Sequence, residues 1–209
     1  MLMASQIQEL ATSLEIPFLI HFTRIENVPS ILEHGIIPIG QAGAKGLAPR
    51  INDTMRLDGQ TSATCVSIAF PNHRMFFKYR NEDKNQDWAV LALNPSVLWQ
   101  KRCAFCRHNA ADGRSTSIPI CDRMTVDALA GMYAEIENHR SRADQKLKSY
   151  DPTDDQAEVL VFDVIEPSLI VGAAFNNMGV LNSHRHLLSG KQIVHSTKIF
   201  SSRSYNREY

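Results

Sequence analysis

The chain has 209 residues, 44% of them hydrophobic, and its 22 basic side chains balance 22 acidic ones. This length and apolar content suffice for one buried core, so we expect a single domain over residues 1–209. The balanced charge excludes a global attraction to nucleic acid or to an anionic membrane. Residues 1–14 lack the basic start and continuous apolar run of a signal peptide, and no later segment has a membrane-spanning length, so we expect a cytoplasmic protein without a membrane partner.

The chain begins with elements that alternate between helix and strand. Apolar residues at helical spacing predict an amphipathic helix over residues 2–14, and residues 18–22 predict a strand. A second helix follows, with Asn27 as its expected N-cap and Gly35 as its stop.

Two polar side chains lie at the junction of this strand and the second helix. His21 and Thr23 occupy the end of the strand, where side chains and free backbone amides can hold a ligand. For His21, the alternative is an ordinary half-buried histidine without a ligand.

The next segment, residues 40–64, is rich in Gly, Ala and polar residues and predicts a long loop, a kind of segment that often carries function. Its glycines do not form a P-loop, because no Lys-Ser or Lys-Thr pair follows them. Strands are predicted at residues 65–70 and 88–93. Residues 45–80 hold more basic than acidic side chains, a pattern typical of either phosphate contact or solvated surface charge.

The cysteines raise a separate question. Cys103, Cys106, His108 and Cys121 could supply four zinc ligands, although the spacing between His108 and Cys121 matches no common zinc finger. The alternative is that these cysteines are ordinary buried core residues. We expect no metal.

The second half of the chain again mixes helix and strand. A helix is predicted over residues 126–140, capped by Thr125, and strands are predicted at residues 168–175 and 192–200. Short strands with few helices indicate an α+β fold built on antiparallel or mixed sheets.

Glu158 stands out among these elements. It precedes the apolar run of residues 159–162, which predicts a buried strand, and a period of two places it on the same face as Leu160 and Phe162. An unpaired buried carboxylate is costly, so Glu158 requires a partner or a chemical role. The alternative is an edge glutamate that turns toward solvent.

Three segments together resemble a known family. His21-Phe-Thr23, followed by residues 25–32 and Gly35, is similar to the opening of the DarT family of nucleic-acid ADP-ribosyltransferases. Gln156-Ala-Glu-Val-Leu-Val161 resembles the catalytic strand of this family, and Asn109-Ala-Ala111 resembles another of its landmarks. The likeness runs from about residue 17 to residue 200 and depends on the order and combination of the segments.

The resemblance implies one ADP-ribosyltransferase domain, a split β-sandwich of two small sheets with flanking helices that holds NAD as co-substrate. Family members transfer ADP-ribose to a nucleobase of single-stranded DNA. They act as toxins of toxin-antitoxin or phage-defence systems, beside a macrodomain-type or other antitoxin. The strand at Cys65 and the turn at Pro71-Asn-His-Arg-Met75 depart from the best-known members that modify thymine, which leaves the target base and an RNA acceptor open. The alternatives are transfer to RNA or to a protein side chain, and a nucleic-acid-binding module with a degenerate NAD site.

The resemblance also assigns roles at the site. Cleavage of the bond between ribose C1′ and nicotinamide builds positive charge on the ribose, so a nearby ionised carboxylate is needed, and Glu158 is expected to be this catalytic group. Phe22 belongs to the same cofactor-binding element as His21 and Thr23, and Asn27 steadies that corner. Arg56 is the expected catalytic and pyrophosphate-binding cation, with Arg50 as the alternative.

The acceptor is expected to meet the loop before Glu158. Tyr150 can stack on a base and Gln156 can form hydrogen bonds to its edge, while a solvated turn is the alternative interpretation of this loop. The full set of expected substrate-binding residues is Tyr150, Thr153, Asp154, Gln156, Arg74 and Asn109.

Overall fold

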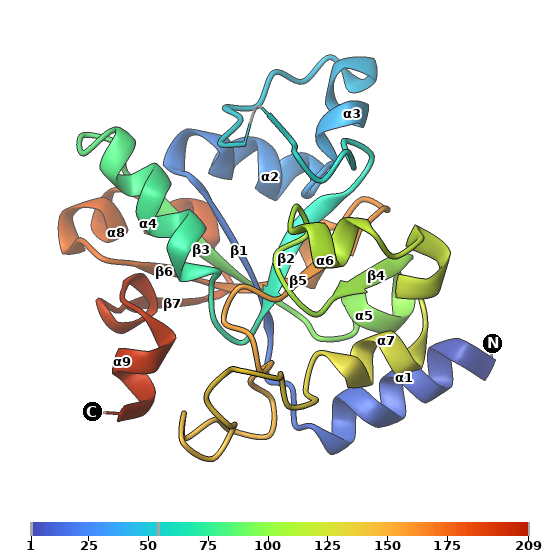
Figure 1. The fold of residues 1–209 in the computed structure, drawn as a ribbon. Helices are drawn as coiled ribbons and strands as arrows, with labels where there is room; N and C mark the ends of the chain where they lie inside the picture. Colours follow the sequence, from blue (N-terminus) through green and yellow to red (C-terminus); the bar gives the residue numbers. More distant parts are fainter. Residues whose placement is uncertain (1, 54, 209) are drawn as a thin grey trace.

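The structure is a computed structural model that describes residues 2–53 and 55–208. Its described part contains one seven-stranded sheet with the order β4-β5-β2-β1-β3-β6-β7 (Figure 1). The strands are β1 Leu19–Arg24, β2 Thr64–Ile68, β3 Trp88–Leu93, β4 Cys103–Cys106, β5 Glu158–Val161, β6 Ile170–Phe175 and β7 Gln192–His195. Neighbouring strands are antiparallel except for β6 and β7, which are parallel.

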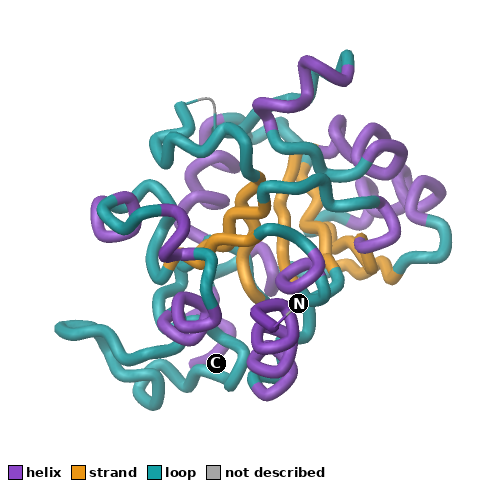
Figure 2. The backbone as a smooth tube through the Cα atoms, turned by 90° about the vertical axis from the view of Figure 1, so that its right-hand side faces the viewer, coloured by secondary structure: helices purple, strands orange, loops and turns teal. Residues whose placement is uncertain are grey.

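Helices cover the strands from both sides (Figure 2). The described α-helices are α1 Leu2–Ser13, α2 Val28–His34, α3 Ile39–Ala42, α4 His73–Glu82, α5 Val97–Gln100, α6 Gly113–Thr116, α7 Val126–Gly131, α8 Met178–His184 and α9 Arg203–Glu208. None of them is both long and apolar enough to cross a bilayer. The α+β class predicted from the sequence is confirmed.

The centre of the sheet is narrow. β1 pairs with β3 along its whole length, at six positions, but it pairs with β2 only at Leu19 and Ile20. Beyond Ile20 the two strands part. The hydrogen bonds therefore join the two expected small sheets into one, and a space opens where β1 leaves β2.

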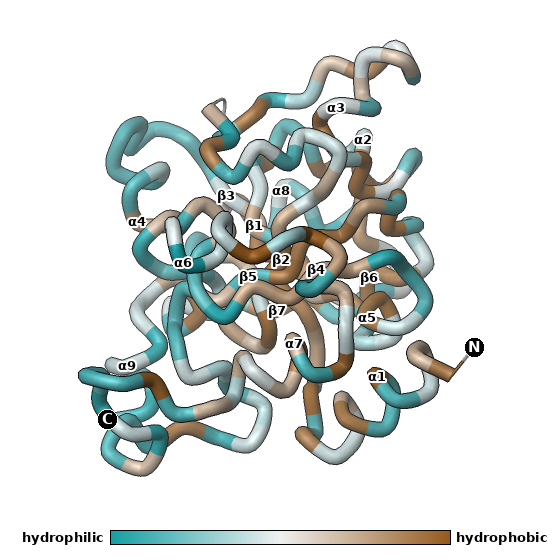
Figure 3. The backbone as a smooth tube through the Cα atoms, turned by 45° about the vertical axis from the view of Figure 1, so that its right-hand side comes forward, coloured by the Kyte–Doolittle hydropathy of each residue, from teal (hydrophilic) through white to brown (hydrophobic). Residues whose placement is uncertain are grey.

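Two apolar clusters fix the strands. The larger one packs one face of the sheet against α1, α2 and α7, with Leu19, Leu91 and Val159 at its centre. The other face carries an aromatic cluster in which the Phe22 and Phe76 rings stack with centroids 4.6 Å apart. The hydrophobic colouring in Figure 3 is concentrated along these central strands.

Several predicted boundaries hold. The helix of residues 2–14, the strand of residues 88–93 and the stop of α2 at Gly35 are all observed. Gly35 has a φ of 85°, and a Cβ at this position would lie 2.5 Å from the carbonyl oxygen of Ile165, so only glycine fits the turn.

Other boundaries differ from the prediction. The helix expected over residues 126–140 ends at Gly131, because the carbonyl of Met132 accepts the N–H of Thr153 at 2.8 Å and not one from the next helical turn. The strand expected at residues 168–175 begins at Ile170, after a turn of 3₁₀ helix. The strand expected at residues 192–200 ends at His195.

Candidate active site

A cleft opens where β1 and β2 part. Its walls come from β1, α2, the loop of residues 36–63, β2, the start of α4 and the first residue of β5. The polar side chains that line it are His21, Thr23, Asn27, Ser30, Arg50, Asn52, Asp53, Arg56, Thr64, Cys65, Ser67, Tyr79 and Glu158.

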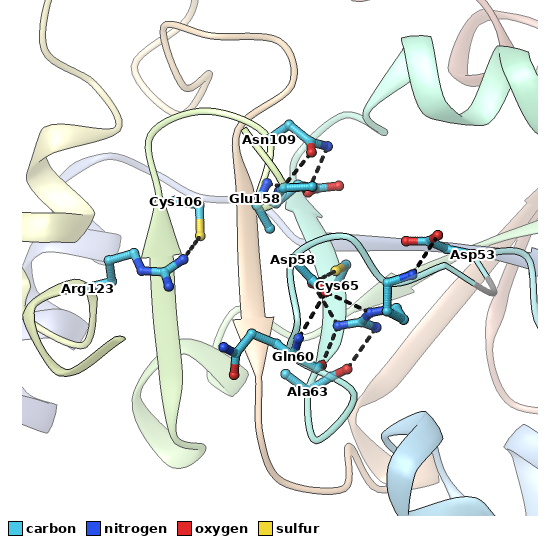
Figure 4. Close-up of polar contacts among 12 residues, drawn as sticks. Asp53, Asp58, Gln60, Ala63, Cys65, Cys106, Asn109, Arg123 and Glu158 are labelled. Carbon is cyan, nitrogen blue, oxygen red and sulfur yellow. Dashed lines mark hydrogen bonds and ion pairs between the residues drawn. The ribbon is translucent and has the colours of Figure 1, made fainter. Parts of the chain in front are cut away.

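Glu158 lies at the inner end of this cleft, and only 3% of its surface is exposed. One carboxylate oxygen accepts a hydrogen bond from Asn72 Nδ2 at 3.2 Å. The other accepts from Asn109 Nδ2 at 3.0 Å and from the Ala110 N–H at 2.9 Å, and Figure 4 shows Asn109 directly beside it. Burial raises the pKa of Glu158 to about 7, and the hydrogen bonds from Ala110 and Asn72 oppose that rise.

The three donors come from segments far from Glu158 in the sequence. Asn72 caps the start of α4, where its Oδ1 accepts the N–H of Met75 at 3.3 Å. Asn109 and Ala110 follow β4. The amide of Asn109 orients the carboxylate, and its expected contact with substrate stays a prediction. Sequence reasoning missed Asn72 because the segment after Pro71 was interpreted as a turn, although an Asn before an amphipathic segment is a helix-start signal.

His21 and Thr23 point into the cleft from the same face of β1. The Nδ1 of His21 donates to the carbonyl of Cys65 at 3.2 Å, which bridges the gap between β1 and β2. Burial lowers the pKa of His21, so its ring is neutral and its Nε2 is a free hydrogen-bond acceptor. Phe22 points to the opposite face of β1, where its ring stacks on Phe76, yet it also lines the cleft, so its contact with NAD stays a prediction.

Asn27 fastens the loop to the start of α2. Its Nδ2 donates to Thr23 Oγ1 at 3.1 Å and to the Arg50 carbonyl at 2.9 Å, and its Oδ1 accepts the Arg50 N–H at 2.8 Å. Asn27 occupies the N-cap position of α2 as expected, but its side chain makes no cap bond to the first turn of the helix. Its amide is occupied by the backbone of residue 50, which holds the loop against the cleft.

Arg56 braces the loop from within. Its Nε and Nη2 donate to the two carboxylate oxygens of Asp58 at 3.0 and 2.8 Å, and its Nη1 donates to the Ala63 carbonyl at 3.1 Å. The Gln60 carbonyl accepts a further bond from Nη2. These contacts occupy most of its donors in this structure, and the expected catalytic and pyrophosphate-binding role of Arg56, which lines the cleft, stays a prediction.

Arg50 has the opposite character. Its backbone is fixed by Asn27, whereas its side chain is exposed at the cleft and forms no hydrogen bond with the described residues. A free guanidinium at the mouth of a cleft suits a phosphate oxygen.

The loop before Glu158 is more buried than expected. Thr153 is fully buried and Asp154 is 9% exposed, with an Asp154 oxygen 2.6 Å from His108 Nδ1. Tyr150 packs against the larger apolar cluster. Thr153 and Asp154 are therefore held within the fold. Tyr150 and Gln156 stay partly exposed, and neither side chain forms a hydrogen bond with the described residues.

Arg74 lies on the exposed side of α4, outside the cleft. Its side chain makes no ion pair within the described part of the chain. The neighbouring Phe77 is 54% exposed, and the side chain of Lys78 is 68% exposed. The three residues form one basic and aromatic surface, which we call the α4 surface.

The possible zinc ligands do not meet. Cys103 donates to the carbonyl of Val97, Cys106 accepts from Arg123, and Cys121 is exposed. Among residues 2–53 and 55–208, no group of three or more His, Cys, Asp or Glu side chains could hold a metal ion.

Comparison with known families identifies the family of the chain. A family model described as "ssDNA thymidine ADP-ribosyltransferase, DarT" matches residues 20–205. The chain belongs to the DarT family. The membership expected from the sequence is confirmed, and with it the class of NAD-dependent ADP-ribosyltransferases. No curated protein matches the chain significantly in sequence.

Solved DarT structures share the fold. DarT from Thermus sp. 2.9 in complex with ADP-ribosylated ssDNA has a TM-score of 0.63 and 12% identity, over 90% of this chain and 97% of that one. The same protein in complex with carba-NAD⁺ gives 0.62 and 13%, over 90% and 99%. Thermosipho africanus DarTG in complex with ADP-ribose gives 0.61 and 16%, over 88% of this chain, which spans 51% of that protein.

Proposed function

We propose that this chain transfers ADP-ribose from NAD to a nucleobase of single-stranded DNA, with Glu158 as the catalytic carboxylate. The observation that carries the proposal is the buried Glu158 at the inner end of the cleft, held by three hydrogen-bond donors. Family membership supports the donor and the acceptor, and the neighbouring structures hold NAD⁺ and ADP-ribosylated ssDNA.

The cleft residues suit two parts of NAD, the nicotinamide ribose and the pyrophosphate. The neutral ring of His21 offers Nε2 as an acceptor for a ribose hydroxyl, and Thr23 lies beside it on β1. Arg50 supplies a cation for the pyrophosphate, in the place first expected for Arg56. The cleft lies between two wings of strands, β4-β5-β2 and β1-β3-β6-β7, joined only at the short β1–β2 pairing, and this supports the split-sheet description of the fold.

Glu158 then serves two purposes. Its ionised form stabilises the positive charge that develops on the ribose as nicotinamide leaves. It can also accept a proton from the attacking base nitrogen, because a pKa of about 7 suits a general base at neutral pH. The amides of Asn72 and Asn109 hold its two oxygens in place for both steps.

The α4 surface is the proposed path of the acceptor strand. Arg74 and Lys78 can contact phosphates and Phe77 can stack on a base, a combination typical of single-strand binding. Asn72 joins the start of α4 to Glu158. A DNA strand that follows the α4 surface toward the start of the helix therefore leads to the catalytic carboxylate. Gln156, in the loop before β5, is the remaining candidate to read the edge of the base.

The partner is proposed by analogy with DarTG. The neighbour from Thermosipho africanus is a DarTG in complex with ADP-ribose, which supports a macrodomain-type antitoxin for this chain. Removal of ADP-ribose from modified DNA by such a partner would complete the toxin-antitoxin role.

The experiment that tests the function uses labelled NAD. The purified chain is incubated with separate pools of single-stranded DNA, RNA and protein, and the label in each pool is counted. We expect label in DNA. Label in RNA or protein alone would contradict the proposed acceptor, and label in none would contradict the enzymatic function.

A further inference from the structure

The segment of residues 151–154, which we call the anchored segment, precedes β5 by a few residues and is buried throughout. Asp151 and Thr153 are fully buried. A buried carboxylate such as that of Asp151 is costly unless it is paired, so its partners show what holds the segment.

Those partners come from α9, about fifty residues later in the sequence. Arg207 donates from Nε and Nη2 to the two oxygens of Asp151 at 2.7 and 2.9 Å. Arg203 is itself 3% exposed and donates to the carbonyls of Pro152 and Thr153 at 2.6 and 3.3 Å. Figure 1 shows α9 beside the loop that leads into β5.

Two further residues, Arg142 and His108, also hold the anchored segment. Arg142 donates to the Asp151 carbonyl at 2.6 Å and to Thr153 Oγ1 at 3.1 Å. Asp154 pairs with His108 at 2.6 Å, which ties the end of the segment to the loop that carries Asn109. Each residue of the anchored segment is therefore fixed by at least one contact from a different part of the chain.

Glu158 has no direct hydrogen bond to α9 or to the anchored segment. Its hydrogen-bond donors are Asn72, Asn109 and Ala110, none of which belongs to α9 or to the anchored segment. Between the anchored segment and Glu158, Asp155 and Gln156 stay partly exposed. The contacts from α9 thus bear most directly on the position of these two residues, while the carboxylate is held by donors from other segments.

We infer that α9 is a positioning element for the acceptor, and that Arg203 and Arg207 are its positioning residues. They hold the anchored segment so that Asp155 and Gln156 face the incoming strand. Loss of the contacts between α9 and the anchored segment weakens productive binding of the acceptor and leaves the binding of NAD unchanged. This inference rests on the proposed transfer to single-stranded DNA.

The test compares Arg207→Ala, the conservative Arg207→Lys and a matched control, Arg140→Ala. The Arg140 side chain forms an ion pair with Glu208 of α9 at 2.6 Å but makes no hydrogen bond to the anchored segment. Initial rates are measured with increasing oligonucleotide at saturating NAD, and with increasing NAD at saturating oligonucleotide. For Arg207→Ala we expect the KM of the oligonucleotide to rise about tenfold, because small displacements of positioning groups have effects of this size, while the KM of NAD stays within about twofold.

Arg207→Lys keeps the charge and loses the two-point contact, so it should show a smaller rise, and Arg140→Ala should match the wild type. An unchanged oligonucleotide KM in both Arg207 variants would overturn the inference. Parallel losses for oligonucleotide and NAD, with a lower melting temperature, would show a merely structural role and overturn it as well. If the wild type transfers nothing, the proposed function fails and the inference falls with it, whereas normal transfer with unchanged KM values refutes the inference alone.

Discussion

The side-chain amide of Asn72 contacts Glu158 and the start of α4 at once. Its Nδ2 lies 3.2 Å from a Glu158 oxygen, while its Oδ1 accepts the N–H of Met75 at 3.3 Å. Only a side chain with both a donor and an acceptor can fill this position, so the residue that begins the helix also orients the carboxylate.

Replacement of Asn72 by Asp should separate the two roles. Asp can still cap α4, but it cannot donate to Glu158 when ionised, and its negative charge raises the pKa of Glu158 further. We expect transfer at neutral pH to fall at least about tenfold, with recovery at higher pH. The measurement is kcat against pH for the wild type, Asn72→Asp and Asn72→Ala. An Asn72→Asp profile that matches the wild type would contradict the role of this contact.

The raised pKa of Glu158 predicts how stability depends on pH. Because the folded pKa is about 7 and the ordinary value is 4.5, the folded state holds this proton more tightly than the unfolded state. The free energy of unfolding therefore falls as the pH rises between these values, by an amount on the order of 3 kcal/mol from this group alone.

Glu158→Gln removes this contribution. Relative to the wild type, its stability should increase between about pH 5 and about pH 8, as measured by urea denaturation at both values. A stability difference between variant and wild type that does not change with pH would show that the carboxyl titrates normally.

Arg50 and Arg56 should behave differently when each is replaced by Ala. The Arg50 side chain is exposed and forms no hydrogen bond with residues 2–53 or 55–208, so its loss should raise the KM of NAD about tenfold without a change in melting temperature. Arg56 braces its loop and pairs with Asp58, whose side chain is 4% exposed, so its loss should cost about 3 kcal/mol of stability. The KM of NAD and the melting temperature, measured for both variants, distinguish the two roles. A raised KM of NAD in Arg56→Ala with an unchanged KM in Arg50→Ala would assign the pyrophosphate contact to Arg56.

The α4 surface makes a prediction about salt. Arg74→Glu should weaken oligonucleotide binding and reduce the slope of log affinity against log salt by about 1, because one phosphate contact is lost. Phe77→Ala should weaken binding without a change in slope. Lys84, exposed just beyond the end of α4, provides the matched control as Lys84→Glu. Equal effects of the Arg74 and Lys84 changes would indicate general charge attraction and not a defined path.

The local pattern of the sequence is enough to identify three polar residues of the cleft. His21 and Thr23 share a face at the end of a strand, and Glu158 begins another, so each was identified from its neighbours in the chain. That these residues meet in one cleft could be predicted only from the family resemblance, because β1 and β5 are not adjacent in the sheet and β2 lies between them.

Contacts between distant segments explain what the sequence could not reveal. Asn72 is 86 positions from Glu158, and Thr153 is buried by Arg203 from a helix 50 positions away. The loop before Glu158 is polar in composition and was therefore expected to be accessible. Its polar groups are instead satisfied by arginines that no local pattern connects to them.

The most direct test of the central claim is mass analysis of single-stranded oligonucleotides after incubation with NAD and either the wild type or Glu158→Gln. The wild type should add the mass of one ADP-ribose to an oligonucleotide that contains the target base, and the folded variant should add none. An adduct formed equally by both proteins would contradict the role of Glu158, and the absence of any DNA adduct with the wild type would contradict the proposed function.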